Sequence, residues 1–441
     1  MSEHCFFDVL NNHSRKCDCI FTSTSIYRVE DLLELSADIR SSARYNKGAC
    51  VALSGLNPLQ LITAIIALDG YVNGILLLPS TTDKATSDLL LHLAQCTHIV
   101  SSKSMVGEPI ADFKATSDNG STLWKLATSG TTGTPKIIEH TLASLSRTVK
   151  KGTANANVFH WGLLYDPARY AGLQVVLQAL LSESRLTIPD LNEFSAKVSL
   201  LGKHGINALS ATPSLWRKLL MDFNSEKLHL RQVTIGGEIA DQMIINSLEK
   251  RFPHARITHI YASTEVGTGF AVTDRKAGFP SVWLDNPKAP VQMRVCKNDR
   301  LWIKPVITPQ GRAILDRSDP DGYIDTEDLV RVTPDRVFFV GRVSGAINVG
   351  GNKVSPELIE ETLRQVEGVV DARVYAKKSS IIGQVVAAEI VPLAEMDKIL
   401  LRAQILAHCQ STLEKWQQPV VINFVKEMEV SGAGKIRRQI V

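Results

Sequence analysis

One segment carries the residue types that a polyphosphate-binding loop needs, and it runs from Thr128 to Lys136 as Thr-Ser-Gly-Thr-Thr-Gly-Thr-Pro-Lys. Its glycines, Gly130 and Gly133, allow main-chain N–H groups to approach an anion closely. Further donors and a positive charge come from Ser129, Thr131, Thr132 and Lys136. The sequence differs from a Walker A loop, because no Ser or Thr follows the lysine. A loop of this composition is, taken alone, more often a solvated linker, so the rest of the chain decides between the two interpretations.

Five further segments stand out in order along the chain: Ile235-Gly-Gly-Glu238, Tyr261-Ala-Ser-Thr-Glu265, Gly322-Tyr-Ile-Asp-Thr-Glu-Asp328, Gly341-Arg342 followed by Asn348-Val-Gly-Gly-Asn-Lys-Val-Ser-Pro-Glu357, and Ser431-Gly-Ala-Gly-Lys435. With the loop, they resemble the motifs of the acyl-adenylate-forming superfamily, which includes acyl-CoA synthetases, nonribosomal peptide adenylation domains and firefly luciferase. The resemblance covers nearly the whole chain, and the motifs are most similar in style to those of acyl- and aryl-CoA ligases.

The resemblance implies roles for these residues toward ATP and Mg²⁺. Lys435 corresponds to the catalytic lysine, which spans the substrate carboxylate and the α-phosphate and stabilises the charge that builds during attack. Thr128 and Glu265 would hold Mg²⁺, a hard cation that prefers oxygen ligands and substrate phosphates. The implied nucleotide-binding set offers N–H donors, hydroxyls, an aromatic face for adenine and a carboxylate for the ribose: Ser129, Gly130, Thr131, Thr132, Gly133, Lys136, Gly236, Gly237, Glu238, Tyr261, Ala262, Ser263, Thr264, Asp328 and Arg342.

A pocket for the acid is predicted around the segment Asp166-Pro-Ala-Arg169-Tyr-Ala-Gly172, which resembles the gate of the family. Arg169 stands where the family often has His, and it either steers the incoming carboxylate or forms a structural salt bridge. Tyr170, Gly172 and Gly267 complete the predicted pocket. The lining is expected in residues 161–173, 236–238 and 261–268, whose mixture of aromatic, small and aliphatic side chains suits an aryl or medium-chain acid.

The activity implied by the resemblance has two steps. A carboxylate attacks the α-phosphorus of ATP, pyrophosphate leaves, and an acyl-adenylate remains bound. The C-terminal lobe then rotates about its hinge, and a pantetheine thiol of CoA or of an acyl carrier protein attacks the mixed anhydride. The near-neutral lobe leaves both acceptors open. The alternative is a degenerate homologue that binds nucleotide or acid as a sensor or scaffold, and the joint presence of the lysines, acids and arginine named above argues against it.

Several features depart from the family pattern. Ser344, followed by Gly345, occupies a hinge position that usually carries Asp or Lys, which leaves the resting orientation of the lobe open. Glu327 replaces the usual Gly before Asp328, and Asn348 replaces a common Lys. The N-terminal stretch is short for the family, which either shrinks the first subdomain or exposes a face that pairs with another chain, as in a homodimer.

The elements that position these residues alternate between helices and strands. Residues 57–68 suit a buried helix followed by a buried strand, and Thr212 with Pro213 opens another helix. This alternation predicts an α/β fold with mainly parallel sheets. Short runs separated by turns from about Val291 predict an antiparallel sheet or a small barrel. Near the end of the chain, a helix that begins at Ser355 with Ile359, Leu363 and Val366 on one face, followed by two strands, predicts an α+β lobe.

We therefore expect an α/β protein with a large N-terminal domain of stacked α/β subdomains plus a small β-barrel, and a mobile α+β C-terminal domain. The expected boundaries are 1–341 for the N-terminal adenylate-forming domain, 342–344 for the hinge and 345–441 for the C-terminal domain.

The composition narrows the class further. The chain has 441 residues, 44% of them hydrophobic and 21% charged, which suits ordinary buried cores. The net charge of +4 includes no basic block, so nucleic acid is not an expected partner. Seven cysteines, an odd number, are typical of reduced thiols in a cytoplasmic protein. No export signal or membrane span is expected, and His254, His259, Cys17 and Cys19 are not expected to bind metal.

Overall fold

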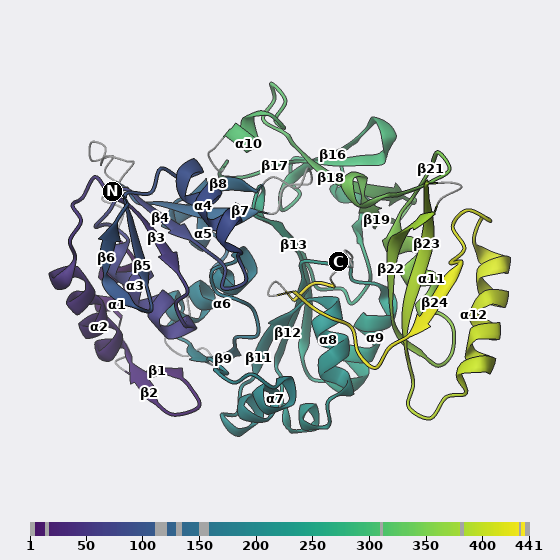
Figure 1. The fold of residues 1–441 in the computed structure, drawn as a ribbon, viewed down its shortest axis with the longest axis horizontal. Coiled ribbons are helices and arrows are strands. Elements are labelled where there is room, and N and C mark those ends of the chain that lie inside the picture. Colours follow the sequence, from purple (N-terminus) through teal and green to yellow (C-terminus); the bar gives the residue numbers. More distant parts are fainter. Residues whose placement is uncertain are drawn as a thin grey trace.

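The computed structural model describes residues 5–13, 17–110, 121–128, 135–149, 158–308, 312–379, 383–431 and 434–436. Figure 1 shows a body of packed sheets and helices, with a smaller lobe of strands and helices beside it, coloured yellow-green to yellow. Within the described residues, no helix combines the length and the apolar character needed to cross a bilayer.

A six-stranded sheet forms one side of the body. Its strands are β3 (Cys50–Ser54), β4 (Gly74–Leu77), β5 (His98–Ser101), β6 (Ser104–Pro109), β7 (Leu123–Thr128) and β8 (Lys136–His140), with helices α3 (Pro58–Leu68) and α4 (Lys84–Leu93). The order is β6-β5-β3-β4-β7-β8, with parallel central strands and antiparallel edges. Asn57 caps the predicted buried helix by accepting a hydrogen bond from Gln60 N. The phosphate-loop segment therefore connects two antiparallel strands, and β8 is a strand that the sequence pattern did not predict.

An eight-stranded sheet forms the centre of the molecule. Its strands are β1 (Asp18–Phe21), β2 (Ile26–Arg28), β9 (His160–Gly162), β10 (Arg185–Thr187), β11 (Ala208–Ala211), β12 (Gln232–Gly236), β13 (Arg256–Ser263) and β14 (Gly267–Val272). Its order is β14-β13-β12-β11-β9-β10-β1-β2. Helices of this part and of the N-terminus are α1 (Phe6–Asn11), α2 (Val29–Ser42), α5 (Leu142–Ser146), α6 (Tyr170–Leu181), α7 (Phe194–Lys203), α8 (Pro213–Met221) and α9 (Gln242–Arg251). The chain between β9 and β13 builds a mainly parallel sheet, as predicted.

The region predicted as a small barrel is a five-stranded antiparallel sheet. It contains β15 (Phe279–Pro280), β16 (Gln292–Cys296), β17 (Arg300–Lys304), β18 (Ile324–Val332) and β19 (Arg336–Arg342), and α10 (Arg312–Leu315) lies in the connection from β17 to β18. The order is β15-β19-β18-β17-β16. Because β18 and β19 are paired, Asp328 lies opposite Arg342.

The lobe has a hydrophobic core of its own, whose described buried residues run from Ile347 to Ile422. It contains β20 (Ile347–Val349), β21 (Asn352–Val354), α11 (Pro356–Arg364), β22 (Val369–Ser379), β23 (Gly383–Pro392), α12 (Lys398–Thr412) and β24 (Val421–Phe424). The predicted apolar face of α11 is confirmed, since Ile359 and Leu363 are fully buried. Gly341 adopts a φ of +144° where the chain enters the lobe, and a Cβ atom there would lie 2.2 Å from Ser355 Oγ.

Candidate active site

Residues 434–436, near the end of the chain, contact the body and bring Lys435 beside Gly236 and Gly237 at the end of β12. The Lys435 Cε atom lies 3.5 Å from the point that a Cβ atom on Gly237 would occupy. Gly236 is more tightly packed, because a Cβ atom there would lie 3.2 Å from the Ile260 carbonyl oxygen. Desolvation lowers the pKa of Lys435 below its ordinary value. The charged groups that also act on this ammonium are four predicted site residues: Glu238, Arg342, Asp328 and Glu265.

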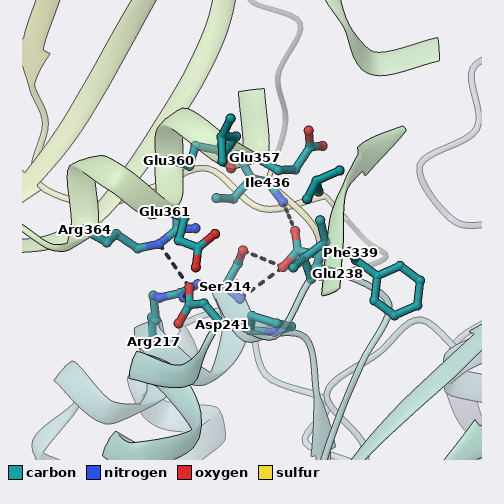
Figure 2. Close-up of a pocket in the computed structure, with 14 residues that line it drawn as sticks. Ser214, Arg217, Glu238, Asp241, Phe339, Glu357, Glu360, Glu361, Arg364 and Ile436 are labelled. Atoms are coloured by element: carbon teal, nitrogen blue, oxygen red, sulfur yellow. Dashed lines mark hydrogen bonds and ion pairs between the residues drawn. The ribbon is translucent and has the colours of Figure 1, made fainter. Parts of the chain in front are cut away.

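Glu238 fixes the segment that carries the lysine, a role that the sequence did not reveal. Its Oε1 atom accepts a hydrogen bond from Ile436 N at 2.9 Å. Its Oε2 atom accepts from Ser214 N at 3.1 Å and from Ser214 Oγ at 2.6 Å (Figure 2). The Thr212 hydroxyl, at the N-cap of α8, donates to Gly434 O. The start of α8 therefore holds the lysine segment in place, and the nucleotide contact assigned to Glu238 by its motif stays a prediction.

Asp328 is the centre of a polar group built by β13, β18 and β19. Its Oδ2 atom accepts a hydrogen bond from the Tyr261 hydroxyl at 2.5 Å, and its Oδ1 atom lies 2.9 Å from Arg342 Nε. Arg342 Nη2 also donates to Thr326 O at 2.8 Å. Burial raises the pKa of Asp328, although the Arg342 charge and the Tyr261 hydroxyl oppose this shift. Three predicted nucleotide residues from distant motifs are thus in direct contact.

The ring of Tyr261 belongs to an aromatic stack. It is parallel to Phe270, with ring centroids 5.2 Å apart and 13° between planes, and to Phe339, with values of 5.1 Å and 2°. Burial raises the pKa of Tyr261 well above its ordinary value, and the neighbouring Asp328 charge acts in the same direction. The hydroxyl therefore stays protonated and keeps its role as the donor to Asp328.

Glu265, the predicted magnesium ligand, has a neighbour that the motifs did not indicate. Arg317 Nη1 lies 3.8 Å from Glu265 Oε1, and Arg317 Nη2 lies 3.0 Å from Glu327 Oε2. Glu327 occupies the position where the family usually has Gly, and it adopts a φ of +61°. Because the contact to Glu265 is longer than a hydrogen bond, that carboxylate keeps lone pairs for a cation. Its oxygen chemistry fits Mg²⁺.

Tyr170 lies beside the start of β14, the strand that follows the Tyr261 motif. Its hydroxyl oxygen is 3.3 Å from Thr268 Oγ1, and it is 3.6 Å from the point that a Cβ atom on Gly267 would occupy. His140 of β8 packs against the Tyr170 ring at 5.9 Å and contacts Thr264 O through Nε2 at 2.9 Å. Burial lowers the pKa of His140 to about 4, so the imidazole is neutral near pH 7. His140 was missed, although a histidine in an apolar segment directly after a phosphate loop was a usable signal.

Arg169 and Gly172 lie at the start of α6. Arg169 Nη2 donates to Thr81 Oγ1 at 3.3 Å, so the guanidinium reaches the loop after β4. The Asp166 charge acts on it, but the shortest described contact is with the threonine hydroxyl. A Cβ atom on Gly172 would lie 2.2 Å from Asp166 O, so close packing of the helix on the preceding turn requires glycine here. The presence of glycine at position 172 therefore has a structural explanation that does not depend on any substrate.

The phosphate loop is described only at its two ends. Thr128 is the last residue of β7, Lys136 is the first residue of β8, and the two are paired across the hairpin. Ala262 and Ser263 end β13, and Ser263 Oγ accepts a hydrogen bond from Val266 N at 3.2 Å. The predicted residues Ser129, Gly130, Thr131, Thr132 and Gly133 lie outside the described residues.

Two known protein families match most of this chain. The AMP-binding enzyme family matches residues 77–301, and the AMP-binding enzyme C-terminal domain matches residues 358–435. The chain belongs to the AMP-binding enzyme family. The two matches together contain Thr128, Glu265 and Lys435, the three residues predicted to be catalytic.

Relatives of this AMP-binding enzyme include two aryl acid ligases. The 3,4-dihydroxybenzoate–[aryl-carrier protein] ligase of Bacillus anthracis is 22% identical, with 88% of this chain and 90% of the relative covered. The 2-succinylbenzoate–CoA ligase of Listeria monocytogenes is 23% identical, with 89% and 88% covered. The alignment with VraA of Staphylococcus haemolyticus is shorter, at 22% identity over 56% of this chain and 54% of that protein.

Solved structures share the fold over nearly the whole length of this AMP-binding enzyme. A variant of E. coli MenE with bound OSB-AMS superimposes with a TM-score of 0.77 at 17% identity, covering 96% of this chain and 94% of that chain. The o-succinylbenzoate CoA synthetase of Bacillus subtilis in complex with ATP and magnesium gives a TM-score of 0.73 at 15% identity, with 99% and 98% covered.

The left-handed backbone at Glu327 of this AMP-binding enzyme leads to a test of stability. A side chain at a φ of +61° is strained, whereas glycine is not. We expect the unfolding free energy of Glu327→Gly to exceed that of Glu327→Ala by about 1 kcal/mol, because both variants lose the Arg317 contact and only alanine keeps the strain. Denaturant unfolding measures the difference.

The matched control is Glu34, which is exposed in the interior of α2. There the order reverses, and Glu34→Ala is expected to be more stable than Glu34→Gly by about 1 kcal/mol. Equal stability of the two Glu327 variants would contradict the strain.

Proposed function

We propose that the protein is an ATP- and Mg²⁺-dependent acid–thiol ligase that forms an acyl-adenylate and then a thioester. The observation that carries the proposal is the position of Lys435 beside Gly237, in the electrostatic field of Asp328, Arg342 and Glu265. Support also comes from the named activities of the relatives, which join aryl acids to CoA or to an aryl-carrier protein. The proposed division of the chain is 1–341 for the body, 342–344 for the hinge and 345–441 for the mobile lobe.

In the first step, a carboxylate oxygen of the acid bonds to the α-phosphorus of ATP. The bond from that phosphorus to the bridging oxygen of the β-phosphate breaks, and pyrophosphate leaves with the electron pair. Lys435 would neutralise charge on the carboxylate and the α-phosphate, while Asp328 would accept the ribose hydroxyls. When bound, Mg²⁺ would neutralise phosphate charge, with Thr128 and Glu265 as its ligands.

In the second step, a pantetheine thiol loses its proton and its sulfur attacks the acyl carbon. The bond from that carbon to the phosphate oxygen breaks, AMP leaves, and a thioester forms. We propose an aryl or medium-chain acid as the substrate, because the Tyr170 ring packs against His140 and its hydroxyl lies beside Gly267, and these residues would line the acid side of the site. A cytoplasmic location is proposed as well, since all seven cysteines are free thiols.

Hydroxylamine trapping over a panel of acids tests the proposal. Hydroxylamine converts any activated acyl group to a hydroxamate, so the assay needs no knowledge of the thiol acceptor. We expect a signal that requires ATP, Mg²⁺ and at least one aryl or medium-chain acid. A folded protein that gives no hydroxamate with any acid would contradict the ligase and favour a nucleotide- or acid-binding scaffold.

The acceptor is identified by comparing CoA with an acidic acyl carrier protein at several salt concentrations. Carrier loading that falls steeply with salt, without a matching loss for CoA, indicates docking of the acidic carrier. Failure with both acceptors, despite hydroxamate formation, would contradict the thioester step alone.

A further inference from the structure

Four buried charges join the body to the lobe. Arg217 of α8 and Asp241, the N-cap of α9, belong to the body, whereas Arg364 of α11 and Asp371 of β22 belong to the lobe. Their side chains are no more than 9% exposed. We call these four residues the ion clamp.

The ion clamp alternates positive and negative groups across the junction. Asp241 Oδ2 lies 2.5 Å from Arg217 Nη2 and 3.3 Å from Arg364 Nε (Figure 2). Asp371 Oδ1 lies 3.4 Å from Arg364 Nη1 and 3.9 Å from Arg217 Nε. Each aspartate therefore contacts one arginine from the body and one from the lobe. When the lobe rotates away from the body, each aspartate loses its contact with the arginine of the other part.

The ion clamp and the lysine segment share one helix. The first turn of α8 holds the lysine segment directly through Thr212, which bonds to Gly434 O, and indirectly through Ser214, which bonds to Glu238. Arg217 follows one turn later. The apolar side chains of the same helix, Leu215 and Trp216, are buried in the core of the body. The orientation of α8 is thus fixed by the body, and its polar side sets both the place of the lobe and the place of the lysine.

Charged side chains of the body and the lobe face each other at this junction. A small cavity of about 30 Å³ lies between α8 and α11. Its lining combines apolar residues such as Leu358 and Phe339 with charged side chains from both parts, including Arg217, Glu238, Asp241, Glu361 and Arg364. The connecting residues Val343–Gly345 carry no charge. Buried ion pairs gain little net free energy, because desolvation offsets most of the attraction. Such a contact defines an orientation and still allows the two parts to separate.

We propose that the ion clamp positions Lys435 for acid activation and has to open before the thiol step. This inference rests on the proposed function. The ion clamp would thereby set the balance between the two half-reactions, with its four residues acting as positioning residues through Lys435.

The decisive variant is Arg364→Gln, studied in the full-length enzyme. We expect amide hydrogen exchange at Ile436 N, which donates to Glu238 of the body, to become about 10- to 100-fold faster, because removing one member of a buried pair leaves its partner uncompensated. Gly434 N bonds within its own turn, to Ser431 O, and serves as the internal reference. Pyrophosphate–ATP exchange should fall by a similar factor. Thioester formation from preformed acyl-adenylate should stay within about twofold of wild type, because that step does not use the docked lysine.

Arg217→Gln is the second variant, and it keeps the test open if Arg364→Gln misfolds. The double variant should show less than the product of the two single effects, because both arginines bind the same acids. The matched control is Arg402→Gln on α12, whose guanidinium donates to Ile422 O within the lobe and should leave both half-reactions unchanged.

Two results would overturn the ion clamp. One is unchanged exchange at Ile436 in both arginine variants, and the other is an equal loss in the two half-reactions. If the wild-type enzyme activates no acid, but amide exchange at Ile436 is still faster in the arginine variants, the proposed function fails while the docking role of the ion clamp stands.

Discussion

Replacing Lys435 by alanine is expected to lower the rate of acid activation by about 10²- to 10³-fold, the usual loss when one preorganised charge-stabilising donor is removed from a site. Nucleotide affinity should change by less than about threefold, because the other proposed nucleotide contacts come from the body and from Arg342 and do not need the lysine. Pyrophosphate–ATP exchange measures the first quantity, and calorimetric titration with ATP measures the second.

The matched control is Lys426→Ala, which removes an exposed lysine from the same terminal part of the lobe and should leave the exchange rate unchanged. Lys435→Arg keeps the charge, but its larger planar group has to fit above Gly237, where the lysine Cε atom already lies 3.5 Å from a Cβ position. We therefore expect only partial activity from arginine. An unchanged exchange rate in Lys435→Ala would exclude the lysine from the reaction.

The charge state of Lys435 also predicts the alkaline side of the pH profile. Desolvation lowers its pKa, so the ammonium is lost at a lower pH than for an exposed lysine. Activation should accordingly decline as pH rises through that lowered pKa. Lys435→Arg should lack this decline, because a guanidinium stays charged throughout the range.

Local motifs allowed much of the fold to be predicted from the sequence. The helix capped by Asn57 and the apolar face of α11 follow from short-range rules of capping and periodicity, and the structure has both. Strand β8 was missed because its five residues, Lys-Ile-Ile-Glu-His, show no clear alternation, and the Gly133 and Pro135 before them were assigned to the phosphate loop. This strand is defined by its pairing with β7, a tertiary contact that the local sequence pattern does not reveal.

The site was predicted at the level of motifs but not at the level of contacts. The ordered motifs assigned Lys435, Asp328 and Arg342 to one nucleotide site, and the structure brings all three residues together. The sequence could not show that Glu238 accepts a hydrogen bond from Ile436 N, because the two residues are 198 positions apart and the donor is a backbone N–H, which no side chain indicates. Arg317 was missed for a different reason: it lies outside the motifs, and its partner Glu327 was noted only as a departure from glycine.

Replacing Asp328 by asparagine is expected to raise the KM for ATP about 10- to 100-fold, because the variant loses acceptors for the proposed ribose hydroxyls and leaves polar partners unpaired. An asparagine oxygen can accept from the Tyr261 hydroxyl, but the amide N–H₂ group then faces Arg342 Nε, which is also a donor. Steady-state kinetics with varied ATP gives both KM and kcat. The fall in kcat should be a smaller factor than the rise in KM.

Stability should respond much less than binding does. Burial raises the pKa of Asp328, so the ionised carboxylate is held at a cost that its attraction to Arg342 only partly offsets. The Arg342 side chain is 43% exposed, so water can solvate its guanidinium once the carboxylate is lost. The unfolding free energy of Asp328→Asn should therefore lie within about 1 kcal/mol of wild type. Asp274→Asn is the control, because Asp274 binds Arg336, the first residue of β19, as Asp328 binds Arg342, the last. The control should leave the KM for ATP unchanged.

The raised pKa of Asp328 fixes the direction of its pH dependence. Protonation removes an acceptor from the proposed ribose site, so kcat/KM for ATP should fall as pH decreases through a pKa that lies above the ordinary range of aspartate. Asp328→Asn carries no titrating group at this position, and its lower kcat/KM should be free of that acidic decline. If the variant keeps both the wild-type KM and the wild-type acidic decline, then Asp328 does not bind the ribose, and its contacts with Tyr261 and Arg342 serve only to join β13, β18 and β19.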